Sequence, residues 1–440
     1  MKNNNPIWDF FASVKLALFT LFILSITSII GTVIPQKESA QWYIDKYGDS
    51  TANLFQILSF TPDMYGSAWF LFLLGLLCLN LIVCSLERFP GVWRQIKADN
   101  LNIPVNRLEK MTPQHQWHSP IKPESVASSL KQALNANGWK AEERKVDDGI
   151  LLFAQQGAIT RTGVYIVHTS ILIIFAGALI GSFLGFKGSV MLPETRTTDK
   201  IYAFDTQAPI DLGFEVRCDS FNMEFYANGM PKFYRSQLAI LENGKVIKEK
   251  AIMVNDPLTY KGITFYQSSY QAYQEFLITI VNKKTGVSES AIIPYQQQQN
   301  MQESGIRLGI INAEGQGQSV IRMKIWFTDD NGEPSVFWLD NGEQATVERS
   351  TSNYTISAKQ MYATGLQVAK DPGVWVVYAG CFLMIIGLIV AFFMSHRRIW
   401  LYIREDTDNM SSILLTGNAN KNKADFEKKM QLLAQQINTI

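Results

Sequence analysis

The chain has 440 residues, 47% of them hydrophobic, and a net charge of +1. Its length would accommodate two or three soluble domains, but the apolar residues are concentrated in a few long runs, which excludes an ordinary soluble protein. The nearly neutral charge gives no indication of nucleic acid as a partner.

Four apolar runs approach or exceed the roughly 20 residues that a membrane-spanning helix needs. They cover residues 14–34, 68–86, 162–186 and 373–394. The first run is too long for the apolar core of a signal peptide and has no small-x-small cleavage site after it. We therefore predict four transmembrane helices, the first of which is not removed.

Basic residues near the ends of these runs predict their orientation, because Lys and Arg are retained on the cytoplasmic side. They are concentrated after the second run, before the third and after the fourth. These residues are Arg88, Arg94, Lys97, Arg144, Lys145, Arg161, Arg397 and Arg398. We expect the N-terminal segment 1–13 and the C-terminal tail 395–440 in the cytoplasm, and the loop 35–67 on the other side.

Two soluble segments remain between the runs. Residues 87–161 contain one stretch with helical spacing between alternating stretches, which predicts a small cytoplasmic β-α-β-β module. Residues 187–372 show many short alternating runs between turn residues, which predicts a large extracytoplasmic antiparallel β domain, either a sandwich or an open barrel. Within it, the glutamine-rich Gln296–Gln302 suggests a flexible excursion.

Motifs for autonomous catalysis are missing from the sequence. The thiols Cys78, Cys84, Cys218 and Cys381 form no C-x-x-C pair, so they are interpreted as small apolar residues. There is no glycine-rich phosphate loop, G-x-S-x-G elbow or H-E-x-x-H helix. We predict no catalytic residue, and whether the chain is an enzyme stays open.

Three of the four histidines have simple interpretations. His115 and His118 form an H-x-x-H in an expected strand or loop, where opposite pleat faces make a shared metal poor geometry. His396 follows the fourth run, where a polar ring beside Arg397 and Arg398 is typical of an interfacial anchor.

His168 is different, because it lies roughly 8 Å inside the cytoplasmic edge of the third run. Ionisable groups at that depth raise a functional hypothesis. On a helix, Ile171, Leu172 and Phe175 share its face, and a neutral imidazole above such a wall would suit a flat apolar cofactor such as haem. The alternative is a hydrogen bond from His168 to a neighbouring span. The opposite face carries Gly177, Gly181 and Gly185, which predicts close helix packing.

Four segments resemble the ResB family, also called CcsB, of cytochrome c biogenesis. These are residues 8–36, 162–185 (TGVYIVHTSILIIFAGALIGSFLG), 254–270 (VNDPLTYKGITFYQSSY) and 364–400, which includes a DPG before the last run and an SHRR after it. The resemblance covers almost the whole chain in order.

The resemblance implies a non-autonomous subunit of the system II cytochrome c synthase, a haem lyase complex in the bacterial inner membrane. A CcsA/ResC-type partner, apocytochrome c and a thioredoxin-like thiol reductant are then expected partners. The cofactor would be haem b, bound transiently and shared with the partner. The family's intramembrane haem-ligand histidine maps onto His168.

Further site residues follow from this hypothesis. His168 would ligate the haem iron and Phe175 would contact the ring, while Arg161, Arg397 and Arg398 would attract the haem propionates, although positive-inside anchoring explains the three arginines equally well. Two other functions stay open: a membrane-anchored sensor with an extracytoplasmic β domain, and a small-molecule transporter, which four spans without an internal repeat make less favourable.

Overall fold

The computed structural model describes residues 5–146, 148–204, 206–225, 231–316, 319–329, 333–350, 352–406 and 410–438. The first four residues of the expected N-terminal segment lie outside this range. The chain divides into two compact units, one formed by Met1–Ala178 with Val374–Ile440 and the other by Leu179–Gly373.

Four helices in the described part of the chain are long and apolar enough to cross a membrane, which confirms the predicted number of spans. They are α2 (Val14–Val33), α5 (Ala68–Ile96), α8 (Gly163–Leu184) preceded by the 3-10 helix η1 (Ala158–Thr162), and α9 (Val374–Leu388) continued by the π-helix η2 (Ile389–Phe393). A helix satisfies its own backbone N–H and C=O groups, so long apolar runs become helices in a bilayer. α5 continues through Pro90 to Ile96 instead of ending at Leu86, because the apolar run marks the membrane-facing part of a helix and not its end.

Short helices precede or connect the spans: α1 (Pro6–Phe11), α3 (Ala40–Tyr47), α4 (Asp49–Ile57) and α6 (Val105–Leu108). Side-chain caps begin two of them. Asn5 Oδ1 accepts a hydrogen bond from the Ile7 amide at 3.0 Å, and Ser39 Oγ accepts one from the Trp42 amide at 3.2 Å. Each cap satisfies an amide that has no partner within its helix.

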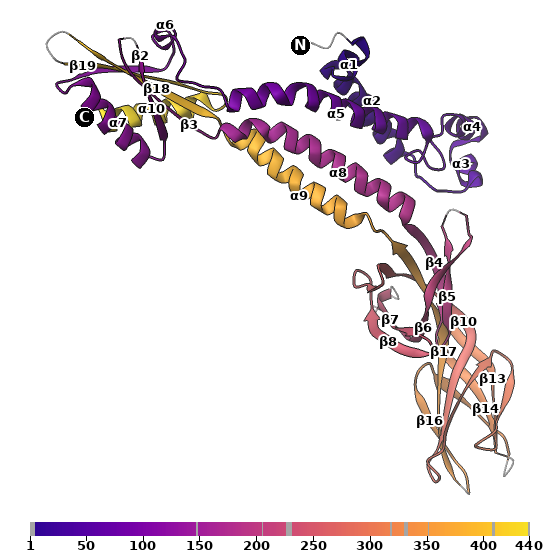
Figure 1. Cartoon of the computed structure of the whole chain (residues 1–440). Coiled ribbons are helices and arrows are strands. Elements are labelled where there is room, and N and C mark those ends of the chain that lie inside the picture. The colour runs from indigo at the N-terminus through magenta and orange to yellow at the C-terminus, as the bar shows by residue number, and fades with distance from the viewer. Residues whose placement is uncertain are drawn as a thin grey trace. The chain divides into compact units, whose positions relative to one another are not determined.

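Small residues bring the backbones of α8 and α9 together, and the two helices lie side by side (Figure 1). A Cβ atom added to Gly387 would lie 2.9 Å from the Val167 amide nitrogen, and one added to Gly163 would lie 2.7 Å from that of Ala391. Gly380 is also close to α8, because a Cβ atom added to it would lie 3.1 Å from the Ser170 carbonyl oxygen. Side chains at these glycines would force the helices apart.

The glycines predicted to pack α8 are also in close contacts. Gly177 is buried. A Cβ atom on Gly181 would lie 2.5 Å from Oδ1 of Asp371, and one on Gly185 would lie 2.5 Å from the Lys370 carbonyl oxygen. The two later glycines therefore contact the segment before α9 rather than α9 itself.

A five-stranded antiparallel sheet forms the α/β module, in the order β1-β19-β18-β3-β2. The predicted β-α-β-β elements are present in it, but the residues expected as a C-terminal tail contribute two further strands and a helix. The elements are β1 (Gln114–Ser119), α7 (Pro123–Ala136), β2 (Lys140–Val146), β3 (Gly149–Gln156), β18 (Arg397–Glu405), β19 (Ser411–Ala419) and α10 (Lys423–Ile437).

The apolar residues of β3 explain why the C-terminal residues belong to this sheet. Ile150, Leu152 and Ala154 lie in a core with α7 and α10, whereas Leu151 and Phe153 lie in a second core with Trp400 and Leu108. A strand that is apolar on both faces needs neighbouring strands and cover on both sides. β18 provides the neighbour, and the segment around α6 covers the second face.

The β domain is antiparallel throughout its described strand pairs, as predicted, and consists of a ten-stranded and a four-stranded sheet. The larger sheet has the order β11-β10-β17-β4-β5-β6-β7-β8, with β16 on β17 and β9 on β10, and the smaller has the order β12-β13-β14-β15. The strands are β4 (Phe186–Pro193), β5 (Thr197–Ala203), β6 (Pro209–Phe225), β7 (Pro231–Glu242), β8 (Lys245–Ile252), β9 (Leu258–Tyr260), β10 (Ile263–Asn282), β11 (Ser288–Pro294), β12 (Gln298–Met301), β13 (Ile306–Gln316), β14 (Ser319–Thr328), β15 (Ser335–Asp340), β16 (Gln344–Glu348) and β17 (Asn353–Lys370).

Two hydrophobic cores share the long strands β10 and β17. One core contains Phe265 and Leu366, and the other contains Phe276 and Ile356 together with the four-stranded sheet. The glutamine-rich segment expected to be flexible instead forms β12, because Met301 is buried in the second core and the backbone pairs with β13.

Candidate functional site

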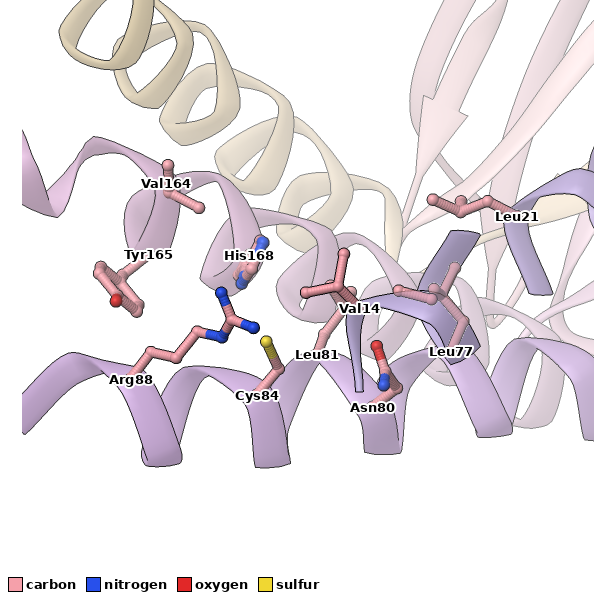
Figure 2. Close-up of a pocket in the computed structure, with 11 residues that line it drawn as sticks. Val14, Leu21, Leu77, Asn80, Leu81, Cys84, Arg88, Val164, Tyr165 and His168 are labelled. Atoms are coloured by element: carbon pink, nitrogen blue, oxygen red, sulfur yellow. The ribbon is translucent and has the colours of Figure 1, made fainter. Parts of the chain in front are cut away.

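A cavity of about 280 Å³ lies among α2, α5 and α8 (Figure 2). Its lining residues are Val14, Ala17 and Leu21 of α2, Leu77, Asn80, Leu81, Cys84 and Arg88 of α5, and Val164, Tyr165 and His168 of α8. Most of this wall is apolar. The volume lies just below the range of about 300–1,000 Å³ that is usual for small-molecule pockets, so these helices would enclose only part of a larger ligand.

Helical spacing explains why α5 contributes more lining residues than α2 or α8. Leu77, Leu81, Cys84 and Arg88 follow one another at three- or four-residue intervals, which places them on one face of the helix. The apolar members of this face lie along the cavity, and Arg88 lies at one end of it (Figure 2).

Asn80 is a buried polar residue in the apolar part of α5, and the break between α1 and α2 explains its position. Its Nδ2 donates to the carbonyl oxygens of Phe11 at 2.7 Å and Ser13 at 3.0 Å. Phe11 is the last residue of α1, so its carbonyl has no partner within a helix, and in a membrane an unsatisfied carbonyl is costly. The Ser13 carbonyl also accepts the Ala17 amide of α2 at 3.3 Å. Asn80 therefore holds the start of α2 against α5 and so defines one side of the cavity.

His168 projects from α8 toward α5 and is half-buried (Figure 2). Its Nδ1 lies 2.8 Å from the Ser85 hydroxyl of α5. The hydrogen bond to a neighbouring span, which was the alternative explanation for this residue, is therefore present. It uses only one of the two ring nitrogens.

In the tautomer that carries its proton on Nδ1, the Ser85 contact leaves the other ring nitrogen free for coordination. When Nδ1–H donates to the Ser85 oxygen, Nε2 carries the free lone pair of the neutral ring. Within the part of the chain that the structure describes, Nε2 of His168 has no hydrogen-bond partner. Metal-binding histidines commonly have this arrangement, with one nitrogen held by a second group and the other free for the metal.

Arg88 and Tyr165 line the cavity but were not predicted as site residues. Tyr165 makes edge-to-face contacts with Phe89, at 5.1 Å between ring centroids, and with His168 at 6.3 Å. Arg88 was counted only as a basic residue that sets orientation. Helical spacing could have identified both as cavity residues, because Tyr165 lies three residues before His168 and Arg88 lies four residues after Cys84.

Phe175, predicted to contact a ligand beside His168, does not line the cavity. It lies two helical turns further along α8 and packs against the cluster that contains Leu24, Met64 and Phe70. The shared helix face was predicted correctly, but α2 and α5 fill the space next to Phe175.

Arg161 belongs to a polar network away from the cavity. Its Nε donates to Nδ1 of His396 at 2.8 Å, and its Nη1 donates to Oε1 of Gln95 at 2.7 Å. Nε2 of His396 lies 3.0 Å from Oε1 of Gln155, and its amide donates to Asn420 Oδ1 at 2.8 Å. His396 is therefore a buried connection between the spans and the α/β module rather than an interfacial anchor.

Arg397 and Arg398 also have partners in the α/β module. Arg397 forms an ion pair with Asp425 of α10 at 2.8 Å. Arg398 is hydrogen-bonded to Asn418 at 3.2 Å and lies over the Trp400 ring. None of the three predicted arginines lines the cavity with His168.

The His396 network predicts a pH-dependent stability. Burial, followed by the nearby charges of Arg161 and Arg398, lowers the pKa of His396 to about 4 from 6.5. Because the folded-state pKa is depressed, the unfolded chain binds more protons between these values, so stability is complete above pH 6.5 and falls toward pH 4. We expect a loss of about 3 kcal/mol across this window, measured as the free energy of unfolding in detergent.

His396→Gln is expected to be less stable at neutral pH but to show a flatter dependence between pH 6.5 and 4. The matched control is His118→Gln, at an exposed histidine of the same module that faces Asp406. If His396→Gln keeps the wild-type slope, His396 does not control the acid sensitivity.

The four cysteines are spread over different parts of the fold: Cys78 and Cys84 lie in α5, Cys381 in α9 and Cys218 in β6. All four are free, and burial raises the pKa of Cys218 to about 12. A thiol with such a pKa is a poor nucleophile. Among the described residues no group of three His, Cys, Asp or Glu side chains could hold a metal ion, so any metal at His168 would need further ligands from elsewhere.

Comparisons with known proteins show which family the sequence belongs to. The model of the ResB-like family matches residues 14–359 and 312–431. A cytochrome c biogenesis protein CcsB from a Synechococcus strain is 27% identical over 97% of this chain and 91% of its own length. A CcsB from Gloeobacter violaceus is 29% identical over 97% of this chain and 90% of its own length. The chain is therefore a member of the ResB-like family.

Proposed function

We propose that this protein is a membrane subunit in cytochrome c biogenesis that holds haem as cargo in the cavity among α2, α5 and α8. The observation that carries the proposal is the environment of His168. Its Nδ1 contacts Ser85 and its Nε2 has no partner among the described residues, beside an apolar cavity. The names of the CcsB relatives support the pathway.

The cavity residues fit a haem that is only partly enclosed. An axial nitrogen, an apolar wall and a flanking aromatic ring are the features that haem sites share, and His168, Leu77, Leu81 and Tyr165 provide them. A cavity of about 280 Å³ cannot surround the whole macrocycle. We infer that a CcsA/ResC-type partner covers the remainder and supplies the second axial ligand.

The proposed path runs outward through the bacterial inner membrane. Basic flanks support a cytoplasmic location for both termini and the α/β module, and an extracytoplasmic location for the β domain. Haem would enter at the cytoplasmic end, be held by His168, and then be passed to the partner for attachment to apocytochrome c, whose cysteines a thioredoxin-like reductant keeps reduced. The chain itself acts by binding and orienting haem.

Thiol labelling tests this topology. A variant with Cys78, Cys84, Cys218 and Cys381 replaced by Ala is expected to keep cytochrome c assembly, since no redox pair exists. In that background, Asn243→Cys in the exposed β7–β8 turn should react with an impermeant maleimide in intact cells, whereas Lys110→Cys should react only after permeabilisation. Labelling at position 110 in intact cells, with none at 243, would reverse the proposed orientation.

The absorption spectrum of the purified protein tests the function itself. Coexpressed with a CcsA/ResC-type partner, the protein should copurify with haem and show the spectrum of a histidine-ligated iron. A colourless complex that also fails to bind added haem would contradict the proposal.

A further inference from the structure

Arg88 is the charged residue of the cavity wall, and its environment leaves it available to a ligand. The other lining residues are apolar or neutral. Within the described chain Arg88 has no hydrogen-bond or ion-pair partner. Its guanidinium points from α5 toward the region of His168 and Tyr165 (Figure 2).

The nearest carboxylate in the sequence does not neutralise Arg88. Glu87 accepts a hydrogen bond from Nε1 of Trp8 at 2.9 Å and so is directed toward α1. A guanidinium beside an apolar cavity in a membrane protein is costly without an anionic partner. Its planar fork matches a carboxylate with two parallel hydrogen bonds.

The position of Arg88 relative to His168 defines an orientation. Ser85 holds the His168 ring, and Arg88 follows Ser85 by roughly 5 Å, about one turn, along α5. A ligand coordinated at Nε2 would thus have one edge near Arg88 and the rest against Leu77 and Leu81.

We propose that Arg88 binds a carboxylate of the iron porphyrin and orients the ring with its carboxylate edge toward this end of the cavity. The inference rests on the proposed function of His168 as the axial ligand. Arg88 takes the role of carboxylate-binding residue that the sequence suggested for Arg161, Arg397 and Arg398. These three arginines have other partners away from the cavity. The protein is then selective for porphyrins with free carboxylates.

Titration of the full-length purified protein with iron protoporphyrin and with its dimethyl ester tests this inference. The wild type should bind the free acid about 10- to 100-fold more tightly than the ester, because a charge-assisted hydrogen bond is lost in the ester. Arg88→Gln should weaken binding of the acid by a similar factor and leave binding of the ester unchanged. Arg88→Lys should recover only part of the preference.

Arg94→Gln is the matched control, because Arg94 lies on the same helix, is exposed and is not part of the cavity wall. It should change neither affinity. The role of Arg88 would be overturned if the wild type bound the acid and the ester with equal affinity, or if Arg88→Gln lost the same factor of affinity for both. In either case, a histidine-ligated spectrum would leave the role of His168 intact. If neither porphyrin gives that spectrum with the wild type, the proposed function is overturned instead.

Discussion

His168→Gly is expected to accumulate in the membrane and to lose most of the haem that copurifies with the wild-type complex. The change removes the imidazole from the cavity wall, while Gly163 and Gly177, which are buried in α8, are unaltered. Even changes to groups that only support a metal ligand cost about 10- to 100-fold in affinity, so the loss of the ligand itself should be at least as large. Haem content per protein and cytochrome c assembly are the measurements.

Free imidazole should restore part of both signals, because the glycine leaves space for it beside Ser85. The matched control is Thr169→Gly, at the adjacent exposed position of α8, which carries the backbone cost of glycine without removing a cavity residue. An unaltered haem spectrum in His168→Gly would leave only the hydrogen bond to Ser85 as its role. The variant would then lose roughly 1 kcal/mol of stability, as expected for such a bond.

Gly387→Val and Gly163→Val are expected to separate α8 from α9. Their Cβ atoms would lie 2.9 Å from the Val167 amide and 2.7 Å from the Ala391 amide, and backbone atoms cannot move aside as a flexible side chain can. Overpacking of this kind costs about 1–3 kcal/mol. We expect a lower thermal midpoint in detergent and less protein in the membrane for each variant.

Gly75→Val is the matched control for these variants. Gly75 lies in the span α5, and a Cβ atom there would meet nothing within 4 Å. Equal stability of Gly387→Val and Gly75→Val would contradict the close contact of α8 with α9.

The spans could be predicted from the sequence because they depend on a local quantity. A run of about 20 apolar residues must form a helix in a bilayer, whatever its neighbours are. Strand β3 shows the limit of this approach. Its residues were interpreted as an alternating strand, and that pattern revealed neither the burial of both its faces nor that its partner β18 comes from the far end of the chain.

The candidate site likewise contains one residue that the sequence revealed and others that only the structure revealed. His168 could be identified from its depth in an apolar run. Ser85 and Arg88, by contrast, gain their significance only from the approach of α5 to α8. Phe175 and Arg161 were assigned from their distance along one helix or from charge, and neither measure reveals which neighbours occupy the space around them.

The sequence by itself therefore determined four candidate spans, an antiparallel β domain and a histidine within an apolar span, because hydrophobicity and alternation act residue by residue. Only the tertiary structure decided that β18, β19 and α10 belong to the α/β module, that His396 is buried with Arg161, and that Arg88 rather than Arg161 lines the cavity. These outcomes depend on contacts between segments far apart in the chain, and such contacts follow from packing and not from local pattern.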